Sequence, residues 1–144
     1  MWTRSREVAA PAAVVWTLLT DVRRWPEWGP TVAEAQLEAG TSIRQGATGR
    51  VRTPVGAWLP FTVTYLRADA AGGSWSWKVA GVPATRHEVL DLGGEASRVR
   101  FATPWWAPAY VPVVELGLRR LGALAEREQS SGQTSGPAPT AGGR

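Results

Sequence analysis

The sequence predicts an α+β domain in which a strongly curved antiparallel sheet of about six or seven strands wraps around one long C-terminal helix. Between residues 31 and 103, short runs alternate apolar with polar side chains and are separated by turns rich in Gly and Pro, which is typical of antiparallel strands. Residues 112–128 instead repeat apolar side chains at helical spacing. The total of 144 residues suits one domain.

The first part of the chain predicts a strand and then two short helices. Residues 2–9 can form the strand, and Pro11 suits the first turn of a helix over 12–20, where its missing N–H is not needed. A second short helix over 21–25 follows, because Asp21 can cap it. The tryptophan-rich stretch after it predicts a tight corner, which we expect to anchor the helices against the sheet.

Six further strands follow in the middle of the chain. The clearest alternation places Trp75, Trp77 and Val79 on one face of a strand and two serines and a lysine on the other. Short turns join the runs, so neighbouring strands are expected to pair in antiparallel fashion. The predicted strands cover residues 31–38, 49–53, 59–67, 74–79, 85–92 and 97–103.

The chain predicts a helix over 112–128 and then a flexible tail. Residues 129–144 contain only Gly, Ser, Thr, Pro, Ala and Gln before the final Arg, and such a segment cannot bury enough apolar area to offset its ordering entropy. We therefore expect one domain over residues 1–128 and a tail over 129–144.

Composition excludes several classes of function. The net charge of +4 comes from scattered arginines rather than a dense basic stripe, so no nucleic-acid partner is expected. With no Cys and a single His, no metal site is predicted, and no cofactor is predicted because phosphate-binding and dinucleotide-binding glycine motifs are absent. No apolar run is long enough for an integral membrane segment. No leader is visible, so we expect a cytoplasmic location. We expect the protein to be a monomer or a homodimer.

The inward faces of the strands and the long helix define a candidate ligand cavity. An aromatic, apolar wall is the usual chemistry of small-molecule pockets. The alternative is a solid core, since two tryptophans on one strand face can fill much of the space themselves. The predicted cavity residues are Phe61, Val63, Tyr65, Trp75, Trp77, His87, Val89, Val99, Phe101, Leu118 and Leu121.

His87 and a group of loop aromatics are the other candidate functional residues. If Val89 points inward, His87 does too, and it could then transfer a proton, contact a ligand polar group, or be a structural residue. The loop aromatics could form a lid over the cavity mouth, plug the end of the core, or, if exposed, contact a membrane or a protein. These residues are Trp58, Trp105, Trp106 and Tyr110.

The chain resembles the SRPBCC superfamily, also called the START or Bet v 1-like helix-grip fold, and within it the bacterial polyketide cyclase/dehydrase-like branch. The resemblance covers residues 2 to about 127. It implies a helix-grip fold and a cavity between the sheet and the C-terminal helix. The matching motifs are Val8 to Trp16, Leu19-Thr20-Asp21, Trp25-Pro26-Glu27-Trp28, the Trp-x-Trp at residue 75 and the Gly-x-Pro-x-x-x-His that starts at Gly81.

Three functions remain open from the sequence. The first is binding of a small apolar or aromatic molecule, lipid-like or polyketide-like, in the cavity. The second is an enzyme of the cyclase/dehydratase kind that uses His87 for proton transfer. The third is a non-enzymatic protein-interaction module that uses the aromatic loop.

Overall fold

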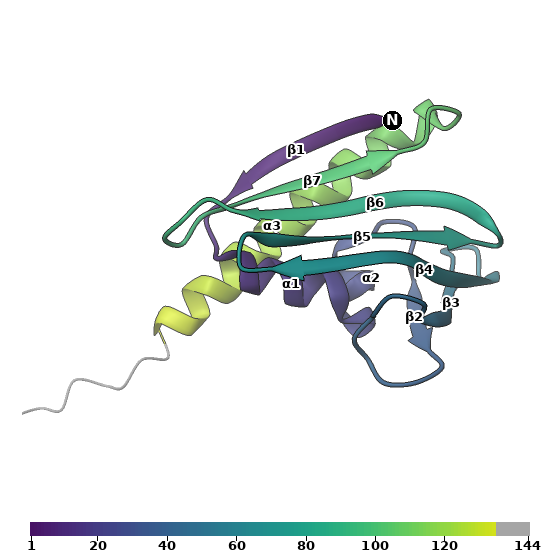
Figure 1. Ribbon diagram of the computed structural model, residues 1–144, viewed down its shortest axis with the longest axis horizontal. Helices are drawn as coiled ribbons and strands as arrows, with labels where there is room; N and C mark the ends of the chain where they lie inside the picture. The colour runs from purple at the N-terminus through teal and green to yellow at the C-terminus, as the bar shows by residue number, and fades with distance from the viewer. Residues whose placement is uncertain (135–144) are drawn as a thin grey trace, which may run out of the picture.

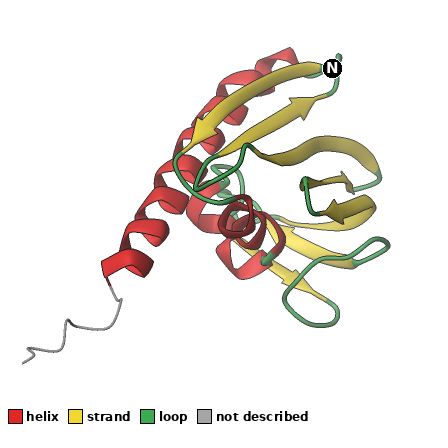
Figure 2. Ribbon diagram, turned by 60° about the vertical axis from the view of Figure 1, so that its left-hand side comes forward, coloured by secondary structure: helices red, strands yellow, loops and turns green. Residues whose placement is uncertain are grey.

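The computed structural model describes residues 1–134, and within them seven antiparallel strands form one sheet with the helices on one of its faces (Figures 1 and 2). The strand order is β1-β7-β6-β5-β4-β3-β2, so each strand from β2 to β7 pairs with its neighbour in sequence and β1 pairs with β7. This arrangement confirms the predicted fold class. The strands are β1 (Trp2–Val8), β2 (Glu34–Leu37), β3 (Thr48–Arg52), β4 (Trp58–Asp69), β5 (Gly72–Val79), β6 (Val82–Asp91) and β7 (Ser97–Thr103). The helices are α1 (Ala12–Thr20), η1 (Val22–Arg24), α2 (Trp25–Trp28), η2 (Pro108–Tyr110) and α3 (Val111–Thr134).

The first short helix forms as predicted, whereas the second, expected over 21–25, is η1 followed directly by α2, which continues through the expected corner to Trp28 because Pro26 lies in its first turn. α1 buries Val15, Leu18 and Leu19 on one face. Asp21 then caps η1, because its Oδ1 accepts a hydrogen bond from the backbone N–H of Arg23 at 3.0 Å. The Arg23 guanidinium also binds this carboxylate and holds the pKa of Asp21 below its usual value.

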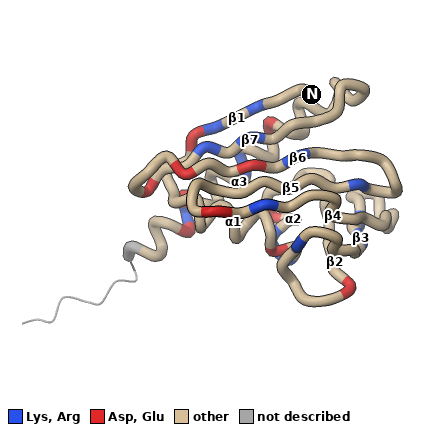
Figure 3. Tube along the Cα trace, viewed as in Figure 1, with Lys and Arg blue, Asp and Glu red and all other residues tan. Residues whose placement is uncertain are grey.

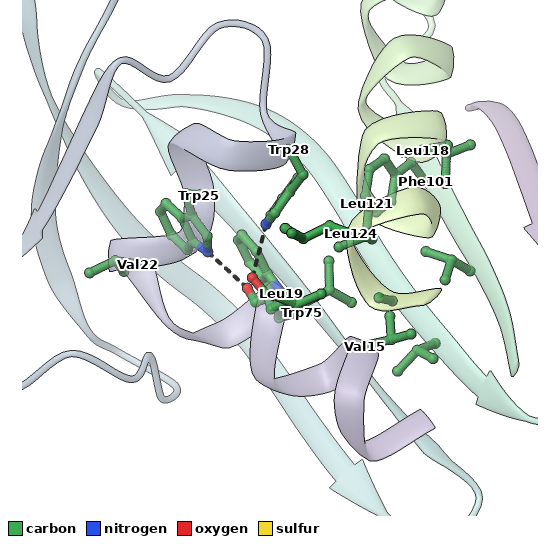
Figure 4. Close-up of a cluster of buried hydrophobic side chains, with 14 of the residues drawn as sticks. Val15, Leu19, Val22, Trp25, Trp28, Trp75, Phe101, Leu118, Leu121 and Leu124 are labelled. Carbon is green, nitrogen blue, oxygen red and sulfur yellow. Dashed lines mark hydrogen bonds between the residues drawn. The ribbon is translucent and has the colours of Figure 1, made fainter. Parts of the chain in front are cut away.

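Trp25 and Trp28 anchor the helical corner in the core, as predicted (Figure 4). The indole N–H of Trp25 donates to the carbonyl oxygen of Leu19, and that of Trp28 donates to the carbonyl oxygen of Leu18, each at 2.9 Å. Both indoles therefore bury their rings with the polar nitrogen satisfied. Trp25 lies parallel to Trp75 of β5, with ring centroids 5.3 Å apart.

The close packing of α1 on β5 requires a residue without a side chain. A Cβ added at Gly73 would lie 2.5 Å from the Trp16 ring, so only glycine lets this helix approach the strand. From the sequence, Gly73 is expected in the hairpin turn before the strand that begins at residue 74, whereas the structure places it inside β5.

β6 begins three residues earlier than predicted. The turn between β5 and β6 needs only Ala80 and Gly81, whose φ values of 52° and 78° match a two-residue turn with both central residues left-handed. Val82 and Pro83 therefore belong to the strand, although the sequence suggests that they extend the turn.

The C-terminal helix is longer than the sequence predicts. α3 continues past the expected end at residue 128 to Thr134, so residues 129–134 are helical rather than part of a flexible tail. Extending an existing helix adds one backbone hydrogen bond for each residue that is fixed. Polar residues such as Gln and Ser can therefore continue a helix without packing against the core. The rest of the predicted tail, residues 135–144, lies outside the described residues.

Candidate functional site

A cavity of about 350 Å³ lies at the end of the sheet where β3, β5 and β7 finish. We call it the mouth cavity. Strands β3 to β7 form one wall, and the loop after α2 together with the connection from β7 to α3 forms the other. Trp106 is 65% exposed and forms part of the rim, so solvent reaches the cavity from this end. The lining residues are Thr31, Val32, Val51, Thr53, Leu59, Trp77, Val79, Val82, Pro83, Ala84, Thr85, Thr103, Pro104, Trp106, Ala107 and Tyr110.

The lining of the mouth cavity is apolar with a few hydroxyl groups. The residues that line it, all within the described part of the chain, include no Lys, Arg, Asp, Glu or His. Burying an unpaired charge in such a site is costly, whereas a neutral polar group can pair with a hydroxyl. The cavity therefore suits an uncharged molecule. The hydroxyl groups belong to Thr31, Thr53, Thr85, Thr103 and Tyr110.

A second, smaller space of about 40 Å³ lies next to the mouth cavity and reaches His87. We call it the inner chamber. Its volume suits about one water molecule rather than a ligand. The two spaces share part of their lining, so they lie side by side with little between them. The shared residues are Thr31, Val32, Trp77, Thr85 and Tyr110.

His87 is buried among aromatic rings at this inner chamber. It is 4% exposed, stacks on Trp75 with ring centroids 4.0 Å apart, and meets the edge or face of Phe101 at 4.8 Å. Burial lowers the pKa of His87 from 6.5 to about 3, because the charged imidazolium would lose its hydration there. The imidazole is therefore neutral at pH 7.

Thr85 joins His87 to the wall of the mouth cavity through hydrogen bonds. The indole N–H of Trp77 donates to Thr85 Oγ1 at 3.1 Å, and the same oxygen lies 3.2 Å from His87 Nε2. His87 Nδ1 has no hydrogen-bond partner within residues 1–134. Thr85 is thus the hydroxyl group that connects the lining of the mouth cavity to His87.

A hydrogen bond between Thr31 and Tyr110 spans the boundary of the two spaces. Their hydroxyl oxygens lie 2.7 Å apart. Thr31 follows α2, and Tyr110 ends η2 just before α3, so this contact joins the two loops opposite the sheet. Both residues line the mouth cavity and the inner chamber, so the contact lies where the two spaces meet.

The space at the middle of the sheet, where the sequence places the cavity, is filled. Trp25 contacts Phe61, Trp75 and Trp77, and Trp28 contacts His87 and Phe101. The side chains of the helical corner therefore fill the space in which the sequence predicts a cavity. Of the predicted residues, Trp77 lines the mouth cavity, and Trp75, Trp77, His87 and Phe101 line the inner chamber. The remaining inward-facing ones are core residues: Phe61, Val63, Val89, Val99, Leu118 and Leu121.

The prediction for Tyr65 is wrong. The pairing of β4 with β5 shifts between Val63 and Tyr65, which marks a β-bulge. The extra residue turns Tyr65 to the outer face, where it is 40% exposed and lies beneath the Arg86 guanidinium, while Leu66 packs against the core. Tyr65 cannot orient a ligand in the cavity from there.

The four aromatic residues of the predicted lid separate into two pairs. Trp106 and Tyr110 line the mouth cavity. Trp105 instead packs against Trp2 of β1 and accepts the Trp2 indole N–H at its carbonyl oxygen. Trp58 lies beneath the Arg50 guanidinium, whose Cζ is 4.4 Å from the centroid of the ring, and it does not line the cavity.

Several residues of the mouth cavity were missed from the sequence. Leu59 shares a strand face with Phe61, so the alternation could have identified it. Thr31 and Val32 carry no such signal, because they belong to the loop after α2 and were expected to begin a strand. Ala107 likewise lies in a connection without periodicity.

The described residues contain neither a metal centre nor a membrane span. Within residues 1–134, no three His, Asp or Glu side chains gather in a way that could hold a metal ion. No helix in the same range is both long and apolar enough to cross a bilayer.

The chain is similar to one described family and to solved structures of the same fold. The sequence profile of a family described as polyketide cyclase / dehydrase and lipid transport matches residues 2–126. Among curated proteins, none matches the sequence significantly.

Three solved structures illustrate the likeness of fold. A hypothetical protein from Helicobacter pylori has a TM-score of 0.69 and 12% identity, covering 85% of this chain and 86% of that one. The ZhuI aromatase/cyclase from a Streptomyces species has a TM-score of 0.62 and 18% identity, covering 88% and 93%. A START superfamily protein from Mycobacterium smegmatis has a TM-score of 0.62 and 16% identity, covering 90% and 97%.

Proposed function

Because the chain belongs to the polyketide cyclase / dehydrase and lipid transport family, we propose that it binds a small, uncharged, largely apolar molecule in the mouth cavity. The single observation that carries this proposal is a cavity of about 350 Å³ whose polar lining consists of neutral hydroxyl groups. That volume falls within the usual range of ligand pockets. Most of the binding free energy would come from burial of apolar area.

Thr85 is the group that would orient the ligand. Neutral His87 carries its proton on one nitrogen, and a buried N–H without a partner is rarer than a buried acceptor without one. Since Nδ1 lacks a partner, the proton belongs on Nε2, which then donates to Thr85 Oγ1. Thr85 Oγ1 accepts from both His87 and Trp77, so its own O–H is free to donate to a carbonyl or ether oxygen of the ligand.

The proton position on His87 can be measured without knowing the ligand. Nitrogen chemical shifts of the imidazole in solution should show a neutral ring with the proton on Nε2 at pH 7. A proton on Nδ1 would instead make Thr85 the donor to His87 and leave only its oxygen lone pair for the ligand, which contradicts the proposed orientation.

A matched pair of fluorescent probes tests the cavity. N-phenyl-1-naphthylamine is uncharged, and 1-anilinonaphthalene-8-sulfonate is the same ring system with a sulfonate. We expect the uncharged probe to bind and the sulfonate to bind at least about tenfold more weakly, because the lining offers no cation. Only the part of each probe's binding that a cavity-filling substitution such as Val79→Trp removes is compared, because an anionic probe can also bind to basic residues outside the cavity. Equal or tighter binding of the sulfonate in that part would contradict an uncharged occupant.

A cavity-filling variant locates the probe. Val79→Trp adds bulk to an inward-facing residue of the mouth cavity, and we expect it to abolish binding of N-phenyl-1-naphthylamine. Leu92→Trp adds the same ring at a residue 40% exposed after β6, at the opposite end of the sheet, and should leave binding unchanged. Full probe binding by Val79→Trp would overturn the proposal.

The buried state of His87 argues against a catalytic use of this residue. A general acid–base catalyst works best with a pKa near the operating pH, and a pKa of about 3 leaves a weak base at neutral pH. Binding without proton transfer by His87 is therefore the function that we favour over the enzymatic alternative.

A further inference from the structure

Apolar side chains project from all three connections that surround the mouth cavity. They belong to the turn between β3 and β4, the turn between β5 and β6, and the connection from β7 to α3, which all lie at the same end of the sheet (Figure 1). Each connection or its border also supplies a residue to the cavity wall, namely Thr53, Val82 and Trp106, so the three surround one opening.

The exposure of these side chains is large for a soluble surface. Val55 is 90% exposed, Trp105 is 67% exposed, Trp106 is 65% exposed and Val82 is 45% exposed. Single exposed apolar residues are ordinary, but a group of them around one opening marks an interaction site. We call these four residues the apolar rim.

The charges around the apolar rim favour an anionic partner. The three connections, residues 53–57, 80–81 and 104–107, contain no Asp or Glu. Among the described residues, neither Lys78 nor Arg50 forms an ion pair. The Arg50 guanidinium donates hydrogen bonds to the neutral side chain of Gln36, so its positive charge is not compensated by a carboxylate. Figure 3 shows basic positions on β3, β5 and β6 toward this end of the sheet.

The carboxylates that border this end are already neutralised. Glu34 of β2 pairs with Arg52 at 3.4 Å, and Glu115 of α3 pairs with Arg4 at 2.9 Å. The uncompensated charge next to the apolar rim is therefore positive. This matches the surface of a membrane leaflet that contains anionic lipids.

We propose that the apolar rim docks on an anionic lipid surface, with Trp105, Trp106 and Val55 entering the interface and Lys78 and Arg50 contacting the headgroups. Tryptophan is enriched at membrane–water interfaces, because its ring is apolar while its N–H still finds polar partners. Three separate tips around an opening can each enter a fluid interface. Docking in this orientation turns the mouth cavity toward the bilayer, so an apolar molecule can pass between them without crossing bulk water.

Vesicle flotation tests the docking directly. The full chain is mixed with vesicles of equal amounts of phosphatidylcholine and phosphatidylglycerol, and in parallel with vesicles of phosphatidylcholine alone. We expect the protein to float with the mixed vesicles, to bind them more weakly as salt is raised, and to bind phosphatidylcholine alone less well. A protein that stays in the soluble fraction with both vesicles would overturn the proposal.

Trp105→Ala is the decisive variant, because Trp105 is exposed and does not line the mouth cavity. We expect its partition into the mixed vesicles to fall by about tenfold or more, the effect of removing an indole from an apolar interface. The matched control replaces Leu90 and Leu92, which are 42% and 40% exposed at the other end of the sheet, by alanine and should float as the wild type does. Unchanged flotation of Trp105→Ala would refute docking through the rim.

Two further measurements separate this proposal from its competitors. Val79→Trp, which fills the mouth cavity, should still float, so a failure of ligand binding is distinguishable from a failure of docking. Sedimentation velocity of the wild type and of Trp105→Ala tests the other occupant of the surface. Self-association of the wild type that disappears in Trp105→Ala would assign the rim to a second copy of the chain and overturn the lipid proposal.

Discussion

Thr85 provides one hydroxyl group as the hydrogen-bond partner of two nitrogen atoms, the half-buried Trp77 Nε1 and the buried His87 Nε2. Replacing it by valine keeps the shape but leaves the Trp77 N–H and His87 Nε2 without this partner. We expect Thr85→Val to lower the free energy of unfolding by about 1–3 kcal/mol, as measured by urea denaturation. Thr85→Ser, which restores the hydroxyl, should recover most of that loss. Equal stability of Thr85→Val and the wild type would show that the two nitrogens do not depend on Thr85.

The buried imidazole of His87 makes stability depend on pH in a defined direction. Burial lowers its pKa from 6.5, the ordinary value that applies in the unfolded chain, to about 3 in the folded protein, so the unfolded state binds the proton first as the pH falls. The free energy of unfolding is therefore highest above pH 6.5 with respect to this group. It decreases as the pH falls from 6.5 toward 3, by up to about 1.4 kcal/mol per pH unit.

Two measurements check this dependence. In an NMR titration, the imidazole resonances of His87 should stay in the neutral position at pH 5. The wild type should also lose stability relative to His87→Phe as the pH falls from 6.5, since phenylalanine cannot bind a proton in the unfolded chain. A midpoint near 6.5 in the folded protein would mean that the ring is hydrated.

At the scale of elements, a side-chain hydrogen bond between Thr31 and Tyr110 joins the connection from β7 to α3 to the loop after α2. Tyr110→Phe removes that bond to Thr31 and keeps the ring. We expect a loss of about 0.5–1.5 kcal/mol and faster amide hydrogen exchange over residues 29–33 and 104–110. Tyr65→Phe is the matched control, because Tyr65 lies on the outer face of the sheet. Identical exchange in Tyr110→Phe would show that the loops are held by packing alone.

Elements with a regular period were predictable, and those with an inserted residue or a two-residue turn were not. Alternation correctly places Trp75 and Val63 on the helical face, because a pleated strand turns successive side chains to opposite faces. The same rule fails at Tyr65, because a bulge adds one residue that the composition of the strand does not reveal.

The position of the cavity could not be predicted for a different reason. Alternation tells which side chains face inward, but not which other side chains meet them there. Trp25 and Trp28 fill the middle of the sheet because their indole N–H groups find carbonyl partners in α1, a contact between segments that no local pattern encodes. The open space is thereby displaced to the end of the sheet, where Thr31 and Ala107 line it.

At the scale of the whole molecule, binding in the mouth cavity should stabilise the entire fold. A ligand that binds only the folded state adds about 2.7 kcal/mol at about 100 times its Kd. For a chain of this size, we expect N-phenyl-1-naphthylamine to raise Tm by several degrees under that condition. Differential scanning calorimetry should show no rise for Val79→Trp. A comparable rise in that variant would place the probe elsewhere on the protein.

The pairing of β1 with β7 has a consequence for how the protein is made. Strands β2 to β6 pair in order, but Trp2 lies opposite Thr103, so the first strand has no partner until the seventh has left the ribosome. At about 5–20 residues per second, β1 waits roughly 5–20 s while the other hairpins form. Its charged residues, Arg4, Arg6 and Glu7, keep the waiting segment hydrated and protect the nascent chain from pairing with another copy.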